Sequence, residues 1–191
     1  VDEPTLGVNF FVNSSPFAGR EGKFVTGRQI RERLKKELIT NLALKVNFKD
    51  DQEVFEVFGR GELHLTILIE NLRREGFELS VSKPKVLYKN DSDGKRLEPY
   101  ETLIMELETE FQGMIMKILG ERGAKLCNME NINEQRVRLE YFVSTRALIG
   151  FHSEFTAITK GTGIFSHSFA KYDSASSTSS QRKNGALVSQ E

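Results

Sequence analysis

The feature of this sequence that most constrains its fold is an order of elements that occurs twice. Between residues 6 and 82 the hydrophobic pattern changes from strand to helix periodicity in the order strand, helix, strand, strand, helix, strand. Between residues 101 and 172 the same order returns. It is the order of the ferredoxin-like βαββαβ unit. The sequence therefore predicts an α+β protein built from two ferredoxin-like domains in tandem.

The first repeat combines alternating strands with two helices that each have one apolar face. Strand periodicity covers residues 6–12, 44–48, 53–59 and 77–82. Thr26 and Gln29 have the spacing of a capping box, and the helix that follows has apolar positions at Ile30, Leu34, Leu38 and Leu42. The second helix places Leu65, Leu68, Ile69 and Leu72 on one face. Gly76 stands where a left-handed helix end is favoured.

The second repeat has strand periodicity at residues 101–108, 125–132, 136–143 and 163–172. One helix carries Phe111, Ile115, Ile118 and Leu119, and the other carries Leu148, Phe151, Phe155 and Ile158, with Ser144 or Thr145 as its expected N-cap. The turn-forming stretch 89–99 is predicted to join the repeats. We therefore predict domains at 1–92 and 93–173, followed by a flexible tail at 174–191 that enters a further, truncated domain.

Charge and composition exclude several classes of protein. The 191 residues include 27 basic and 27 acidic side chains, so binding to nucleic acid or membrane would need a local patch. No apolar run is long enough to span a bilayer and no secretory signal begins the chain, so we expect no membrane partner. The single cysteine, Cys127, permits no internal disulfide and suits the reducing cytoplasm, where we expect the protein to act. The chain begins with Val1 rather than methionine, and we expect it to be part of a longer protein.

The most suggestive chemical group is His64, which lies two residues after Glu62 at the start of a helix. A zinc protease helix needs two histidines one turn apart with a glutamate between them, and no second histidine lies one turn away. The chain has three histidines in all, His64, His152 and His167. We expect His64 to bond a neighbouring strand or loop, and we predict no metal site and no catalytic residue in this chain.

The glycine-rich segment at residues 19–26, GREGKFVT, is similar in composition to a phosphate-binding loop. The Walker motif needs four residues between its first glycine and Gly-Lys, and here only two intervene. We therefore expect no nucleotide to bind at this loop. Arg20 and Lys23 still stand before a helix N-terminus, a position suited to a phosphate backbone or an acidic protein surface. The alternative is an ordinary solvated loop.

Separate basic clusters are the remaining functional signal. They lie on the first helix, between the repeats and in the second repeat, at Arg28, Arg31, Arg33, Lys35, Lys36, Lys83, Lys85, Lys89, Lys95, Arg96, Arg122, Lys125, Arg136 and Arg138. Contact with the phosphates of a structured RNA would explain such clusters on a neutral chain, although each cluster alone is also typical of a solvated face. The aromatic signature of RNA-recognition sheets is absent, which favours recognition by shape and charge over stacked bases.

Several long stretches resemble one known family. GRGELHL at residues 59–65, followed by an apolar helix, resembles the third domain of translational GTPases such as elongation factor G. SSPFAGREGKFVTGRQIRERL at 14–34 and KPKVLY at 83–88 are similar to one bacterial branch of that family. In the second repeat, FQGMIMKILGERGAKL at 111–126 and KGTGIFSHSFAKY at 160–172 are similar to the fifth, ribosome-facing domain. The resemblance covers nearly the whole chain.

This resemblance implies ferredoxin-like folds similar to domains III and V of elongation factor G. It also implies a GTP-hydrolysing parent protein that binds the ribosome and acts in stress response and ribosome assembly. The GTP-binding domain, where GTP and Mg²⁺ would bind, has no counterpart among these residues. We therefore expect this chain to be non-catalytic and to hold no cofactor.

The resemblance also suggests contact residues and partners. Arg20 and Lys23 are candidates for contact with the GTP-binding domain or with ribosomal RNA. Arg122, Lys125 and Lys160 are candidates for contact with ribosomal RNA. The expected partners are the ribosome, through its RNA and proteins, and the GTP-binding domain of the same protein. The alternative is a free-standing ferredoxin-like module that binds RNA or docks a protein.

Overall fold

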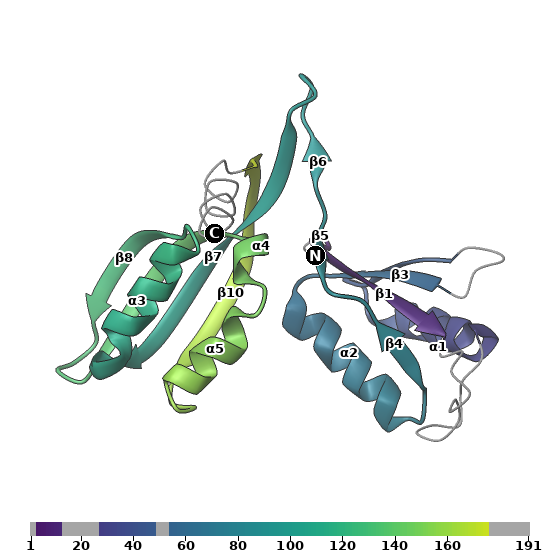
Figure 1. Cartoon of the computed structure of the whole chain (residues 1–191), viewed down its shortest axis with the longest axis horizontal. Coiled ribbons are helices and arrows are strands. Elements are labelled where there is room, and N and C mark those ends of the chain that lie inside the picture. Colours follow the sequence, from purple (N-terminus) through teal and green to yellow (C-terminus); the bar gives the residue numbers. More distant parts are fainter. Residues whose placement is uncertain (1–2, 13–26, 49–53, 176–191) are drawn as a thin grey trace, which may run out of the picture. The chain divides into compact units, whose positions relative to one another are not determined.

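The computed structural model describes residues 3–12, 27–48 and 54–175, and the chain divides into two compact units, Val1–Leu87 and Tyr88–Glu191. Each unit contains an antiparallel sheet with helices packed on it (Figure 1). In each unit the four strands of the repeat lie in the order second, third, first, fourth across the sheet. This is the ferredoxin-like order, so the predicted α+β class and the repeated βαββαβ unit are confirmed. The domain limits at 1–92 and 93–173 stay a prediction.

The first unit contains β1 (Leu6–Val12), α1 (Gly27–Thr40), β2 (Lys45–Asn47), β3 (Val54–Gly59), α2 (Glu62–Arg74), β4 (Leu79–Val81) and β5 (Lys85–Val86). Every second side chain of its central strands is buried, at Leu6, Val8, Phe10, Phe55 and Val57. The two helices complete the core with Ile30, Leu34, Leu65, Leu68 and Leu72. The period-two alternation thus decides which face of the sheet the helices cover.

Two glycines define the bounds of α2. A Cβ added to Gly59 would lie 2.9 Å from Leu65 Cδ2 and 2.9 Å from His64 Nδ1, so only glycine lets the first turn of the helix approach β3 this closely. At the other end Gly76 has a φ of 100°. The backbone N–H of Phe77 then donates to the carbonyl oxygen of Leu72 (3.0 Å), which closes the helix. The predicted left-handed end at Gly76 is confirmed.

Helix α1 ends earlier than its apolar pattern predicts. Its last residue is Thr40, and Leu42, expected on the buried face, is 74% exposed. After the helix the side chain of Asn41 donates to Glu37 Oε2 (3.1 Å), and the backbone N–H of Leu44 donates to the carbonyl oxygen of Asn41 (3.2 Å) in a turn. Arg33 fixes α1 to the end of α2 by donating through Nε and Nη2 to the two carboxylate oxygens of Glu75, at 2.6 and 2.8 Å. The predicted N-cap at Thr26 lies outside the described residues.

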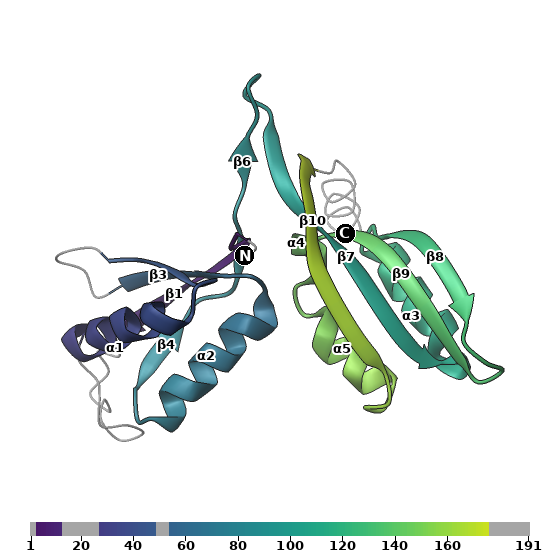
Figure 2. The ribbon, with the colours of Figure 1, turned by 180° about the vertical axis from the view of Figure 1, so that it is seen from behind.

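The second unit contains β6 (Lys89–Asn90), β7 (Arg96–Glu108), the 3-10 helix η1 (Thr109–Phe111), α3 (Gln112–Glu121), β8 (Lys125–Asn131), β9 (Arg136–Ser144), α4 (Thr145–Leu148), α5 (Phe151–Ile158) and β10 (Ile164–Ser174). Its core lies between the sheet and the helices and includes Leu103, Met105, Leu107, Ile115, Leu119, Val137, Leu139, Tyr141, Phe151 and Phe155. Figure 2 shows the face of this sheet that α3 and α5 leave open.

The stretch at 89–99, predicted only as a joining segment, forms a β-hairpin. Lys89 pairs with Leu97, so β7 begins before residue 101, where the alternation first becomes regular. The carboxylate of Asp91 accepts hydrogen bonds from the backbone N–H groups of Asp93 (2.9 Å) and Lys95 (2.8 Å). Gly94 has a φ of 83°, which the turn requires. The turn-forming residues thus close a hairpin at the start of the second unit.

The last helix predicted from the sequence is divided into α4 and α5. The hydroxyl of Ser144 accepts from the backbone N–H of Ala147 (3.1 Å), so one of the two predicted N-caps is confirmed. Gly150 has a φ of 80° and separates the two helices, because a left-handed residue cannot continue a right-handed helix. Phe151 then begins α5 and is fully buried.

Candidate nucleic-acid interface

His64 lies in the first turn of α2 and bonds the loop before it and the end of α1. Its Nδ1 accepts from the backbone N–H of Arg60 (3.2 Å), so the proton is on Nε2, which lies 3.2 Å from Asn41 Oδ1. Burial, together with the charge of Arg60, lowers the pKa of His64 and favours the neutral ring. The prediction that His64 bonds a neighbouring loop is confirmed.

Two features are absent from the part of the chain that the structure describes. No group of three histidine, cysteine, aspartate or glutamate side chains there could hold a metal ion. None of the described helices is long and apolar enough to cross a membrane. The lone thiol, Cys127, is exposed on β8.

Arg122 follows α3 and bonds the connection between α4 and α5. Its Nη1 donates to the carbonyl oxygens of Ala147 (2.6 Å) and Ile149 (3.0 Å), and its Nη2 donates to Glu154 Oε1 (3.0 Å). Its guanidinium carbon lies 5.4 Å from the ring centre of Phe151. These bonds satisfy carbonyl groups that the short helix α4 leaves without helical partners. Arg122 therefore holds the segment that leads into α5.

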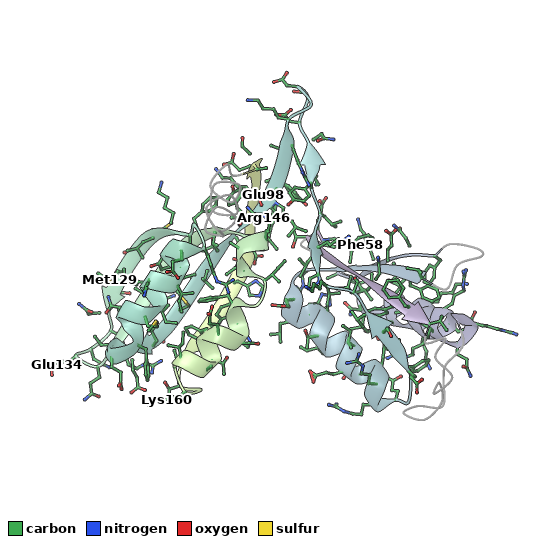
Figure 3. All side chains as sticks on the ribbon, in the orientation of Figure 1. Phe58, Glu98, Met129, Glu134, Arg146 and Lys160 are labelled. Atoms are coloured by element: carbon green, nitrogen blue, oxygen red, sulfur yellow. The ribbon has the colours of Figure 1, made fainter. Side chains whose placement is uncertain are left out.

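Lys125 and Lys160 are exposed and lie at opposite ends of the second unit. Lys125 begins β8 and pairs with Phe142, which itself pairs with Thr102 in the first half of β7. Lys160 follows α5 with a φ of 54°, and its Nζ lies 6.0 Å from the ring centre of Phe111, beyond the far end of β7. Figure 3 labels Lys160 beside the last turn of α5.

The residues predicted as contacts do not form one site. Arg122 and Lys125 lie close together in the chain, at the end of α3 and the start of β8, whereas Lys160 lies at the other end of the unit. Arg20 and Lys23 lie outside the described residues. At the predicted positions, the described part of the chain therefore has two exposed lysines, Lys125 and Lys160, and one arginine, Arg122, that is bonded within its own unit.

A buried ion pair near Arg122 is not evident from the sequence. Arg146 on α4 donates through Nε and Nη2 to the carboxylate of Glu98 on β7, at 3.2 and 3.3 Å, and both residues are labelled in Figure 3. A pocket of about 370 Å³ is lined by Arg122, Arg146 and Glu154, among others. Glu98 and Arg146 are 48 residues apart, so no local motif joins them.

Comparison with known proteins agrees with the residue motifs. Residues 95–183 match the family described as the elongation factor G C-terminus. Over 190 residues, 99% of this chain, the sequence is 54% identical to the large ribosomal subunit assembly factor BipA of Buchnera aphidicola (subsp. Schizaphis graminum). The chain is BipA-like over almost its whole length. The identity with BipA of Escherichia coli K12 is 52% over the same share of this BipA-like chain. The expected family is therefore confirmed.

The extent of these matches limits what they show about this BipA-like chain. It spans 31% of the length of both BipA relatives. A crystal structure of a protein from Thermus thermophilus matches 95% of the chain and 42% of its own length, with a TM-score of 0.58 and 14% sequence identity. At that identity the similarity concerns the fold alone. The match to the elongation factor G C-terminus begins one residue before β7 and includes every later element of the second unit.

Proposed function

We propose that this chain is the ribosome-binding portion of a translational GTPase that acts in assembly of the large ribosomal subunit and in stress response. The observation that supports the proposal most is the similarity of 99% of the chain to proteins named large ribosomal subunit assembly factor BipA. GTP and Mg²⁺ would bind outside these 191 residues, in a GTP-binding domain of the same protein. The chain itself would be non-catalytic and would act in the cytoplasm, where ribosomes assemble.

The proposed contacts with ribosomal RNA are electrostatic. Lys125 and Lys160 are exposed, which suits contact with phosphates. Arg122 uses Nη1 and Nη2 for bonds within its own unit, so its share would be to hold the α4–α5 segment in place for binding. Arg20 and Lys23 are proposed to contact the GTP-binding domain or ribosomal RNA. Ribosomal proteins complete the proposed set of partners.

Co-sedimentation with purified large ribosomal subunits tests the proposal. The double variant Lys125→Glu/Lys160→Glu should bind more weakly than the unaltered chain. Its log affinity should depend less steeply on log salt, by about 0.7–0.9 for each phosphate that the variant no longer binds. Lys117→Glu, which makes the charge change of one of these two substitutions at an exposed position of α3, is the control. Equal binding by the double variant removes both lysines from the interface. No binding of the unaltered chain at low salt rejects the function itself.

A second assay tests the proposal that GTP hydrolysis takes place outside this chain. Because the proposed GTP site lies outside this chain, the purified chain should release no phosphate from GTP, with or without Mg²⁺. Sustained GTP hydrolysis that copurifies with the chain through two different separations would contradict the proposal of a non-catalytic segment.

A further inference from the structure

Four residues on four adjacent strands form one row across the first sheet. Lys45 of β2 pairs with Phe58 of β3. Phe58 also pairs with Gly7 of β1, and Gly7 pairs with Lys85 of β5. The neighbouring row, which contains Leu6, is buried under the helices, so these four residues face the other side of the sheet. We call them the lysine–phenylalanine row.

Gly7 makes room for the ring of Phe58. A Cβ added to Gly7 would lie 2.6 Å from Cδ1 and 2.8 Å from Cε1 of Phe58, so the ring rests directly over the β1 backbone. Gly7 does not have the positive φ that would require glycine. A glycine inside a strand weakens the strand, and it often marks a place where another group approaches the backbone closely. Here that group is an aromatic ring, which stays partly exposed and is labelled in Figure 3.

The ring lies between two cations. Lys45 and Lys85 are both exposed, and within the described part of the chain neither takes part in an ion pair. They are separated by three strand spacings, about 14 Å. Glu56 lies two residues before Phe58 and is the nearest carboxylate along β3 on the same face of the sheet. It accepts a hydrogen bond from Asn47 Nδ2 (3.0 Å), so part of its charge is engaged locally. The row thus presents an aromatic centre with a lysine at each end.

This arrangement matches the chemistry of an unpaired nucleotide. A base presents an apolar face that stacks on an aromatic ring, and the phosphates on either side attract lysines. Double-stranded RNA offers no exposed base face, and an acidic protein surface makes no use of the central ring. We propose that the lysine–phenylalanine row binds single-stranded RNA, with one base on Phe58 and neighbouring phosphates at Lys45 and Lys85. This inference rests on the proposed function, which supplies ribosomal RNA as the partner.

No sequence motif contains the lysine–phenylalanine row, because its members come together only through strand register. Phe58 and Gly7 are far apart in the chain, and the lysines come from two further strands. The absence of the aromatic RNA-recognition signature therefore does not argue against stacking at this position. The row adds base stacking to the recognition by shape and charge that the sequence favours.

Fluorescence anisotropy with a labelled oligouridine of about ten nucleotides tests the proposal on the full 191-residue chain. Phe58→Ala should weaken binding about 5- to 150-fold, the range expected for loss of one stacked base, while the salt dependence stays unchanged. Phe58→Tyr keeps an aromatic ring and should bind like the unaltered chain. Gly7→Ala should weaken binding because the added methyl group displaces the ring.

The lysines provide a test that does not depend on the packing of Phe58. Lys45→Gln/Lys85→Gln changes exposed side chains only and should reduce the salt slope by about 1.4, or about 0.7 for each phosphate contact on a single strand. Lys35→Gln/Lys36→Gln, which removes two charges from exposed positions of α1 in the same unit, is the matched control and should leave the slope unchanged. Thermal unfolding of every variant shows that each one folds.

The outcomes separate this inference from the proposed function. The inference is overturned if the unaltered chain does not bind oligouridine. It is also overturned if Phe58→Ala and the double lysine variant both bind oligouridine as tightly as the unaltered chain does. If Phe58→Ala weakens co-sedimentation with large subunits but not oligouridine binding, the row contacts a protein and the inference is wrong. If oligouridine binding depends on Phe58 while the unaltered chain fails to sediment with large subunits, the inference stands and the proposed function fails.

Discussion

Arg146 on α4 forms an ion pair with Glu98 on β7, at 3.2 Å between Nε and Oε1, and the Glu98 side chain is only 1% exposed. The Arg146 side chain remains 22% exposed. A buried carboxylate is costly to desolvate unless a cation with good geometry faces it. The pair therefore joins the start of the first long strand of the second unit to the short helix that leads into α5.

We expect Arg146→Ala to lower the free energy of unfolding by about 3 kcal/mol, because Glu98 stays buried after losing its charged partner. Urea denaturation of the chain measures this change. Lys171→Ala removes a partner of the exposed pair with Asp173, in which the side chains are 59% and 48% exposed, and should cost less than about 1 kcal/mol. If Arg146→Ala and Lys171→Ala lower the free energy of unfolding equally, the buried ion pair contributes no more to stability than the exposed pair.

Gly163 is packed against the core of the second unit, and we expect Gly163→Ala to destabilise the chain by about 1–3 kcal/mol. An added Cβ would lie 2.5 Å from Phe155 Cζ and 2.9 Å from Thr159 Oγ1, both in buried residues. Gly120 in α3 is the control, because nothing lies within 4 Å of its added Cβ. Gly120→Ala should stabilise the helix by about 0.5–1 kcal/mol. If Gly163→Ala and Gly120→Ala change the unfolding temperature in the same direction, the close packing of Gly163 is contradicted.

The pH dependence of stability should contain a contribution from His64. Burial lowers its pKa in the folded state below the ordinary value of 6.5. Below 6.5 the unfolded chain then binds more protons at this position than the folded chain does. The stability that His64 contributes is therefore complete above 6.5 and is lost as the pH falls through 6.5 towards the lower folded value.

Thermal unfolding at about pH 7.5 and about pH 5.5 tests this sign, because the two values lie on either side of the ordinary histidine pKa. His64→Gln should lose less stability between them than the unaltered chain does. An NMR titration of His64 in the folded chain gives the pKa directly. A value at or above 6.5, or the same pH dependence in both chains, would be inconsistent with the two hydrogen bonds that hold the neutral ring.

Arg122 and Lys125 are close in the chain but should respond differently to mutation. Arg122→Gln breaks bonds to Ala147, Ile149 and Glu154, and we expect it to cost about 1–3 kcal/mol of stability. Lys125→Gln changes an exposed side chain at the start of an edge strand and should stay within about 0.5 kcal/mol of the unaltered chain. Chemical denaturation distinguishes the two roles. If Arg122→Gln leaves the free energy of unfolding unchanged, Arg122 does not hold the α4–α5 segment in place.

Much of the fold could be predicted because the apolar spacing is regular where strands and helices bury one face. Phe10 and Phe55 mark the buried face of their strands, and Gly76 marks the end of α2. The errors arose where local bonds decide the structure. A turn at Asn41 follows α1 before Leu42, and Gly150 divides a continuous apolar pattern into two helices. The hairpin that the side chain of Asp91 closes was also not predicted from the turn-forming residues alone.

The candidate interface could be predicted only in part, because charge can be counted in a sequence but its partners cannot. Arg122 stands beside Lys125 in a basic cluster, yet its guanidinium bonds carbonyl groups from residues 147 and 149. Lys45 and Lys85 belong to different stretches of sequence, and strand register brings them to either side of Phe58. Family motifs identified the relatives correctly, but they carry no information on such long-range pairs.

The most direct test of the proposed function compares binding of this chain to isolated large and small ribosomal subunits at several salt concentrations. We predict preferential binding to large subunits, with an affinity that falls linearly with salt on a logarithmic scale, as phosphate contacts require. Equal or weaker binding to large subunits, or binding that does not change with salt, would contradict an assembly factor segment that recognises ribosomal RNA of the large subunit.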